Sequence, residues 1–147
     1  MAGVTLTVGA MPFVSIEVRQ GVTTPQQRTA ISDAIASAMI EVLAIPADDR
    51  FHVFHELPDG SMFHEPVAFG KPRSDRLMFI TLSLNHRTPD VKTALFASLV
   101  RHLRDTAGVP SEDVMFRIIE TAPENWWADG RTVNPETGYD ERMTPVG

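Results

Sequence analysis

The stretch TPQQRTAISDAIASAMIEVLAIP (residues 24–46) decides the fold, because its pattern returns 64 residues later as TPDVKTALFASLVRHLRDTAGVP (residues 88–110). Each copy opens on Thr-Pro and closes on an aliphatic residue followed by proline. The agreement continues past the closing proline, where Asp49 and Glu56 recur as Asp113 and Glu120. A chain that repeats its turn residues and its apolar positions at one offset is built from two copies of one unit.

Each unit is predicted to run strand, helix, strand. Thr24 and Thr88 suit a helix N-cap with proline at the first helical position, and Gln27 completes a capping box with Thr24. The first helix carries one apolar stripe at spacings of three and four, and it ends before Pro46. The stripe is formed by Ile31, Ala34, Ile35, Ala38, Met39, Val42 and Leu43. Four flanking segments are rich in β-branched, aromatic and aliphatic residues and predict strands: 12–18, 50–57, 76–84 and 114–121.

These elements predict an α+β domain made of duplicated β-α-β units. Within each unit the strands are parallel and joined by a right-handed crossover, which gives a four-stranded sheet with two helices on one face. The strands at 12–18 and 76–84 read as apolar on both faces, so the second face needs a cover. A partner subunit supplies it most simply, and we expect a symmetric homo-oligomer.

The chain length of 147 residues indicates one domain. We expect an N-terminal extension at 1–11, a domain at 12–131 with repeats at 12–57 and 76–121, and a C-terminal tail at 132–147. The link 58–76 and the segment from 122 onward belong to neither repeat and read as loops.

Composition excludes several functional classes. The net charge of −6 argues against nucleic-acid and anionic-membrane binding, and the absence of cysteine excludes disulfides and thiolate chemistry. No apolar run is long enough to span a membrane, and residues 1–10 make a poor signal peptide, so we expect a cytoplasmic protein. His52 and His55 point to opposite faces of a strand, and we expect neither a metal site nor a cofactor.

The positions at which the two copies differ are the candidates for chemistry. Pro12 falls opposite Arg76, Asn85 opposite Gly21, and Arg87 opposite Thr23. Pro12 leads the first strand, whereas Asn85 and Arg87 end the first strand of the second copy. If the two inner strands pair, these side chains converge at one end of the sheet.

Several motifs together resemble the tautomerase superfamily, and most closely the branch that includes malonate semialdehyde decarboxylase. They are Pro12 at the head of a β-α-β duplication, IPADDRF (45–51), SLNHRTPDVKTALF (83–96) and PENWWADG (123–130). The resemblance covers roughly residues 12–131. It implies a homotrimer in which the proline becomes the N-terminus through loss of an initiator methionine, here Met11.

The resemblance also implies roles for individual residues. Pro12 would serve as general base or acid, Arg87 would bind the carboxylate of a small acid, and Asn85 would bind the same acid or an enolate oxygen. Asp49 matches the water-activating aspartate of the decarboxylase, and Trp126 or Trp127 would line the pocket. Because Asn85 stands where the decarboxylases carry the first of two arginines, tautomerisation is favoured over decarboxylation or hydration.

Plainer roles exist for the same residues. Pro12 within a longer chain is a strand-initiating proline, and Asp49, like Asp113, suits a turn. Arg87 before a helix cap suits a surface arginine, and the tryptophans suit packing anchors. A non-catalytic trimeric binding protein, with residues 3–8 added as a strand that blocks the proline, is the alternative from another functional class.

Overall fold

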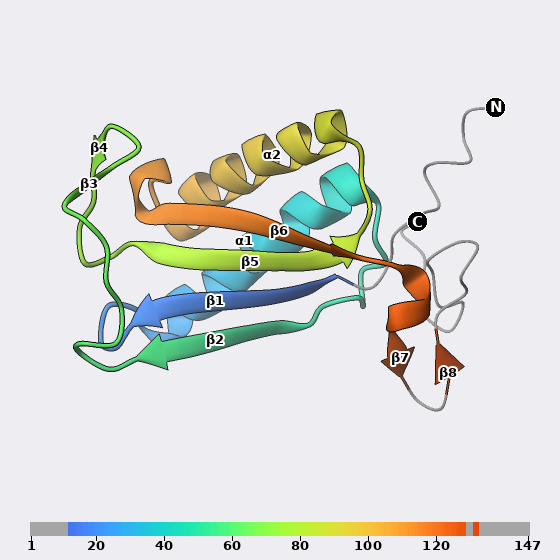
Figure 1. Ribbon diagram of the computed structural model, residues 1–147, viewed down its shortest axis with the longest axis horizontal. Coiled ribbons are helices and arrows are strands. Elements are labelled where there is room, and N and C mark those ends of the chain that lie inside the picture. Colours follow the sequence, from blue (N-terminus) through green and yellow to red (C-terminus); the bar gives the residue numbers. More distant parts are fainter. Residues whose placement is uncertain (1–11, 129–130, 133–147) are drawn as a thin grey trace.

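A computed structural model describes residues 12–128 and 131–132 (Figure 1). The two repeats form β1 (Phe13–Arg19), α1 (Pro25–Leu43) and β2 (His52–Leu57), then β5 (Met78–Asn85), α2 (Pro89–Ala107) and β6 (Val114–Thr121). The predicted extension at 1–11 and the tail from 133 onward lie outside the described residues.

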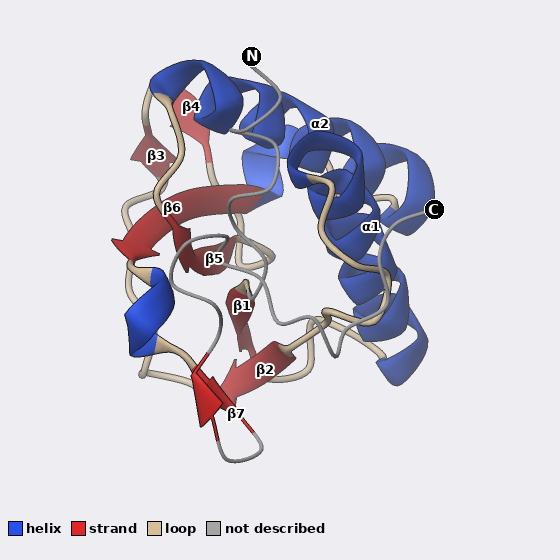
Figure 2. Cartoon of the chain, turned by 90° about the vertical axis from the view of Figure 1, so that its right-hand side faces the viewer, coloured by secondary structure: helices blue, strands red, loops and turns tan. Residues whose placement is uncertain are grey.

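The four long strands form one sheet in the order β2-β1-β5-β6. Strands β1 and β2 pair in parallel, as do β5 and β6, whereas the two inner strands pair antiparallel, with Phe13 opposite Ser83. This arrangement confirms the predicted duplicated fold. Figure 2, which views the molecule from one end of the sheet, shows both helices on one face.

The helix ends follow the predicted chemistry. The Thr24 hydroxyl accepts a hydrogen bond from the Gln27 N–H at 3.1 Å, and Thr88 caps α2 in the same way through the Val91 N–H at 3.3 Å. Helix α2 ends at Gly108 with φ +67°, the left-handed geometry that glycine adopts without strain. Among the described residues, neither helix nor any shorter one is long and apolar enough to cross a membrane.

The core lies between the sheet and the helices. It combines every second residue of the inner strands with the apolar faces of α1 and α2, which also pack on each other. The fully buried members include Val14, Ile16, Ile31, Ile35, Met39, Ile80, Leu82, Leu95 and Leu99. The predicted stripe of the first helix is therefore the core face, with Val42 half-buried at its edge.

The opposite sheet face is mixed in character, so the prediction of strands apolar on both faces is wrong there. Arg117 donates from Nε to the Thr81 hydroxyl at 2.9 Å, beside Glu17. Apolar side chains are also exposed on this face, namely Phe13 at 39%, Val53 at 37% and Ile119 at 48%. A hollow of about 250 Å³ lies around Thr81, Arg117 and Glu17, and Phe79, Ile80, Met115 and Phe116 complete its lining.

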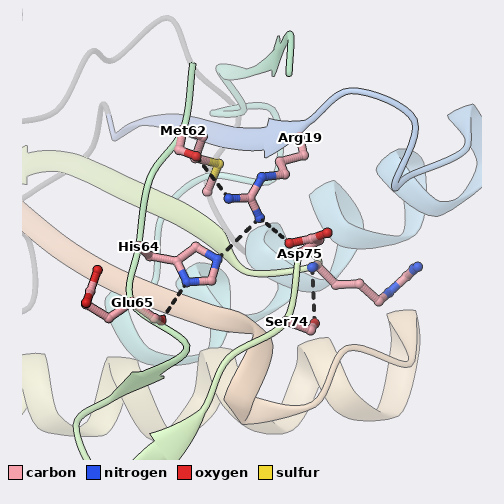
Figure 3. Close-up of polar contacts among 7 residues, drawn as sticks. Arg19, Met62, His64, Glu65, Ser74 and Asp75 are labelled. Carbon is pink, nitrogen blue, oxygen red and sulfur yellow. Dashed lines mark hydrogen bonds and ion pairs between the residues drawn. The ribbon is translucent and has the colours of Figure 1, made fainter. Parts of the chain in front are cut away.

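The link between the repeats, predicted as a loop, contains a small hairpin of β3 (Val67–Ala68) and β4 (Lys71–Pro72). Phe69 and Gly70 turn it with φ +53° and +73°, the positive pair that suits a two-residue hairpin turn. Arg19 anchors the link by donating to the Met62 carbonyl at 2.9 Å and to Asp75 at 3.0 Å (Figure 3).

The segment after β6, also predicted as a loop, holds a short 3₁₀ helix (Pro123–Asn125) and a second hairpin. That hairpin pairs β7 (Trp127–Ala128) with β8 (Arg131–Thr132). It hangs from the end of the sheet where β1 begins and β5 ends (Figure 1).

One helix–strand contact differs between the repeats. In the first, the Ser32 hydroxyl lies 2.7 Å from His52 Nδ1, whereas the corresponding residues of the second are Phe96 and Phe116, stacked at 5.8 Å. His52 Nε2 is buried without a hydrogen-bond partner among the described residues. Burial, together with the charge of nearby Arg50, lowers the pKa of His52 from 6.5 to about 4.

The low pKa of His52 predicts a loss of stability in mild acid. Between pH 6.5 and about 4 the unfolded chain binds a proton at His52 and the folded chain does not. The free energy of unfolding therefore falls as the pH is lowered through this range. Because the ring is only partly buried, we expect a loss of about 1 to 2 kcal/mol after allowance for solvent screening. Denaturant unfolding of wild type and His52→Phe, at one protein concentration and several pH values, measures it. The difference in free energy of unfolding between wild type and His52→Phe should change over this pH range. A constant difference contradicts the low pKa of His52.

Candidate active site

Pro12 lies at the end of the sheet where β1 begins and β5 ends. The printed pairing of the two inner strands ends with Phe13 opposite Ser83, so Pro12 lies at the end of the sheet where Leu84 and Asn85 close β5. Pro12 is buried. The prediction that Pro12, Asn85 and Arg87 converge depended on antiparallel pairing of the inner strands, and the structure has that pairing.

Asn85 is the last residue of β5 and is 1% exposed. Trp126 Nε1 donates to Asn85 Oδ1 at 2.8 Å. An indole N–H can only donate, so it must face the amide oxygen and thereby fixes the orientation of the amide. The end that Asn85 turns away from Trp126 is its NH₂, a donor group suited to a carboxylate or enolate oxygen.

Arg87 lies two residues further, in the turn between β5 and α2, and is 8% exposed. Its Nη1 donates to the carbonyl oxygens of Asn85 at 2.9 Å and His86 at 3.1 Å, which folds the guanidinium back over the end of the strand. Burial lowers the pKa of Arg87, while the charge of Glu120 acts in the opposite direction. An arginine stays protonated under these conditions, so the site holds a buried cation.

Asp49 enters the same end of the sheet from the turn before β2. It is 2% exposed, and its backbone N–H donates to the Pro46 carbonyl at 3.1 Å, so it also closes the turn that ends the first helical crossover. Two residues further on, the Phe51 carbonyl accepts a hydrogen bond from the Val14 N–H at 2.9 Å, which ties the segment after this turn to the start of β1. Asp49 therefore lies at the end of the sheet where Pro12 precedes β1.

The two predicted tryptophans are separated by the structure. Trp126 is half-buried against Asn85, whereas Trp127 is 69% exposed on β7. Successive residues of an extended segment point to opposite sides, so only one of the pair can face Asn85. The described structure therefore places Pro12, Asp49, Asn85, Arg87 and Trp126 at one end of the sheet, with Trp126 rather than Trp127 in contact with Asn85.

The opposite end of the sheet carries the corresponding positions of the other repeat. There a hollow of about 90 Å³ is lined by Thr23, Arg76 and Asp113, which match Arg87, Pro12 and Asp49 at the 64-residue offset. Burial raises the pKa of Asp113, and Arg76 partly offsets that effect. The duplication thus supplies two similar ends, of which one has the proline and the buried arginine.

Sequence reasoning treated Glu120 as a fold residue and missed its part in this region. The Glu120 carboxylate accepts from the backbone N–H of Arg87 at 2.9 Å and from Lys92 at 3.0 Å, and these two bonds lower its pKa. The sequence signal that could have found it is a basic residue and a glutamate that recur at the same spacing in both repeats. Arg28 and Glu56 in the first repeat have the same separation as Lys92 and Glu120 in the second.

Comparison with known proteins agrees with this geometry. Two family models, both described as tautomerase enzymes, match residues 49–127 and 12–76. The probable tautomerase YusQ of Bacillus subtilis (strain 168) is 32% identical over 123 residues, which is 82% of this chain and 96% of the relative. The chain belongs to the tautomerase superfamily.

Solved structures narrow the placement within that superfamily. Malonate semialdehyde decarboxylase, solved in wild-type, mutant and inactivated forms, has a TM-score of 0.73 and 25% identity, covering 81% of this chain and 91% of that one. A second malonate semialdehyde decarboxylase, from FG41 and inhibited by 3-bromopropiolate, has a TM-score of 0.69 and 32% identity, covering 78% and 87%. A fused 4-OT, an asymmetric trimer, shares the fold with a TM-score of 0.65 and 19% identity, covering 82% and 94%. The chain lies in the branch that resembles malonate semialdehyde decarboxylase.

Proposed function

We propose that the protein is a tautomerase that interconverts the keto and enol forms of a small 2-oxo or β-dicarbonyl carboxylic acid, with Pro12 as general base and acid. The observation that carries this proposal is the convergence of Pro12, Asn85 and buried Arg87 at one end of the sheet. It is supported by the tautomerase family model that matches from residue 12.

The proline acts through a free amine, which it possesses once translation begins at Met11 and that methionine is removed. An α-amino group titrates near roughly 7.7 to 8.0 in water, and burial favours its neutral form. The neutral amine takes a proton from the carbon next to the carbonyl, and the C–H electron pair forms the enol double bond. The carbonyl oxygen becomes an enolate, and the amine returns the proton at oxygen or carbon.

The other residues of the site bind and polarise the acid. Arg87 offers the forked donors that match a carboxylate, in a buried place where a charged hydrogen bond is stronger than in water. The Asn85 amide, oriented by Trp126, donates to the acid or to the enolate oxygen. Trp126 also covers part of the site, which lowers the local dielectric constant. Trp127 stays a candidate only if a partner subunit or substrate covers it.

Decarboxylation or hydration of a three-carbon oxo acid such as malonate semialdehyde is the second candidate. Buried Asp49 and the similarity to two malonate semialdehyde decarboxylases favour it. In that reaction Pro12 is protonated, and Asp49 orients or activates water. Asn85 in place of the first of the two arginines weakens this candidate.

We propose that the protein works as a homotrimer without a cofactor, in the cytoplasm. Support comes from the exposed apolar side chains on the sheet face that the helices leave open, and from the trimeric fused 4-OT of the same fold. Sedimentation equilibrium should give three times the mass of one chain, and a monomer at micromolar concentration contradicts the proposal.

Two assays separate the candidate reactions. We expect the protein that starts at Pro12 to catalyse ketonisation of enol-phenylpyruvate, followed by the loss of enol absorbance. Malonate semialdehyde tests the alternative, since decarboxylation yields acetaldehyde and carbon dioxide in equal amounts. Turnover of malonate semialdehyde alone favours the decarboxylase over the tautomerase. Turnover of neither acid favours a non-catalytic binding protein, and turnover by the chain that starts at Pro12 but not by the chain that starts at Met1 indicates a proline blocked by the preceding residues.

A further inference from the structure

Glu120, near the end of β6, ties down the turn that carries Arg87. Its Oε2 accepts from the Arg87 backbone N–H at 2.9 Å and lies 3.0 Å from both His86 Nδ1 and Lys92 Nζ. One carboxylate oxygen thus binds groups from the turn and from the first turn of α2. A hydrogen bond to an ionised carboxylate is about twice as strong as one between neutral groups.

Glu56, at the other end of the sheet, shows what the matching glutamate does where there is neither Pro12 nor a buried arginine. Glu56 lies 3.7 Å from Arg28, the position that matches Lys92. Arg28 donates instead to the carbonyl oxygen of Thr23 at 3.1 Å and to its hydroxyl at 3.0 Å, and Thr23 matches Arg87. The first repeat therefore ties its turn to the helix, whereas the second ties its turn to the sheet through a carboxylate.

The tie constrains the guanidinium as well as the backbone. Arg87 Nη1 donates to Asn85 O and His86 O, both of which belong to the segment that Glu120 holds. The backbone N–H, the two carbonyl groups and the guanidinium form one connected network within three residues. With the backbone fixed, few conformations of Arg87 are lost when it binds an anion, and such preorganisation strengthens binding.

We propose that Glu120 is a positioning residue that holds the Arg87 turn in the conformation that binds the carboxylate of the substrate. This inference rests on the proposed function, because it assumes that Arg87 meets the carboxylate. Glu120 acts through Arg87 and has no contact with the reacting atoms. Lys92 and His86 serve to keep the Glu120 carboxylate charged and in place.

Glu120→Ala and the matched variant Glu56→Ala test this role. With enol-phenylpyruvate, we expect KM to rise about 10-fold in Glu120→Ala with kcat changed less than about 3-fold, since ground-state and transition-state binding of the carboxylate weaken together. Glu120→Gln keeps an oxygen acceptor for the Arg87 N–H, and its KM should lie between that of wild type and that of Glu120→Ala. Glu56→Ala should match wild type in both constants.

Two further measurements do not depend on turnover. Amide hydrogen exchange at Arg87 should be faster in Glu120→Ala than in wild type, because its N–H loses its acceptor. Binding of malonate, followed by calorimetry, should weaken about 10-fold in Glu120→Ala and further in Arg87→Ala. If Glu120→Ala does not fold, Glu120→Gln carries the same measurements with a smaller expected effect.

The results distinguish a failure of this inference from a failure of the proposed function. Malonate binding that weakens in Arg87→Ala but not in either Glu120 variant, with unchanged exchange at Arg87, overturns the positioning role alone. If malonate binding weakens in both Arg87→Ala and Glu120→Ala but the wild-type protein turns over no oxo acid, the catalytic proposal is overturned and the positioning role is supported. Malonate binding that is insensitive to Arg87→Ala overturns both.

Discussion

Arg87→Ala is expected to lower kcat/KM for enol-phenylpyruvate by about 100-fold or more, mostly through KM. A charge-assisted hydrogen bond contributes about 1.5 to 3 kcal/mol, and 2.7 kcal/mol corresponds to about 100-fold in binding. Arg87 is 8% exposed, so solvent screens the lost interaction only weakly. Steady-state kinetics of the purified variant provide the measurement.

Two control variants sharpen the Arg87 experiment. Arg87→Lys keeps the charge but loses the planar fork, and we expect it to recover only part of the activity. Arg76→Ala removes an exposed arginine at the other end of the sheet and should leave KM unchanged. A KM for Arg87→Ala within about 2-fold of wild type contradicts the proposed carboxylate site.

Pro12→Ala is expected to lower kcat by about 100-fold and to change KM by less than about 3-fold, because general base catalysis contributes roughly 10² to 10⁴ in rate. The alanine variant keeps a primary amine that rotates freely, whereas the proline ring fixes the direction of its nitrogen lone pair. Rates at saturating substrate, in protein verified to start at residue 12, measure the effect.

One added residue gives the sharper control for Pro12. A chain with a single alanine placed before Pro12 turns the amine into an amide, which has no lone pair for a proton, and its rate should fall to background. Retained activity in that chain contradicts a role of Pro12 as base and leaves Asp49 as the remaining buried candidate.

Most of the fold could be predicted because the pattern of turn residues and apolar positions occurs twice in the sequence. The Thr-Pro helix starts at 24 and 88 and the shared apolar spacing predict two units, whereas the sequence leaves the pairing of the two inner strands as a condition. The hairpin at Phe69 and Gly70 could not be predicted in the same way. Phenylalanine at positive φ is unusual, and no turn motif in the sequence predicts it at Phe69.

The candidate site was predictable only where backbone topology determines it. Antiparallel pairing alone puts Pro12 and Asn85 at the same end of the sheet. The choice of Trp126 over Trp127 depends on the direction of the chain after β6, which the sequence pattern does not specify. The bond from Glu120 to the Arg87 N–H needed the three-dimensional distance between a strand end and a turn, 33 residues apart in the chain.

The intact mass and N-terminal sequence of the protein expressed from its native gene test the central claim most directly. We expect a chain that begins at Pro12, with a free secondary amine at the end of the sheet that also carries Asn85 and Arg87. A chain that begins at Met1 or Ala2 leaves Pro12 as an amide, and that result contradicts the proposed mechanism while leaving the fold as described.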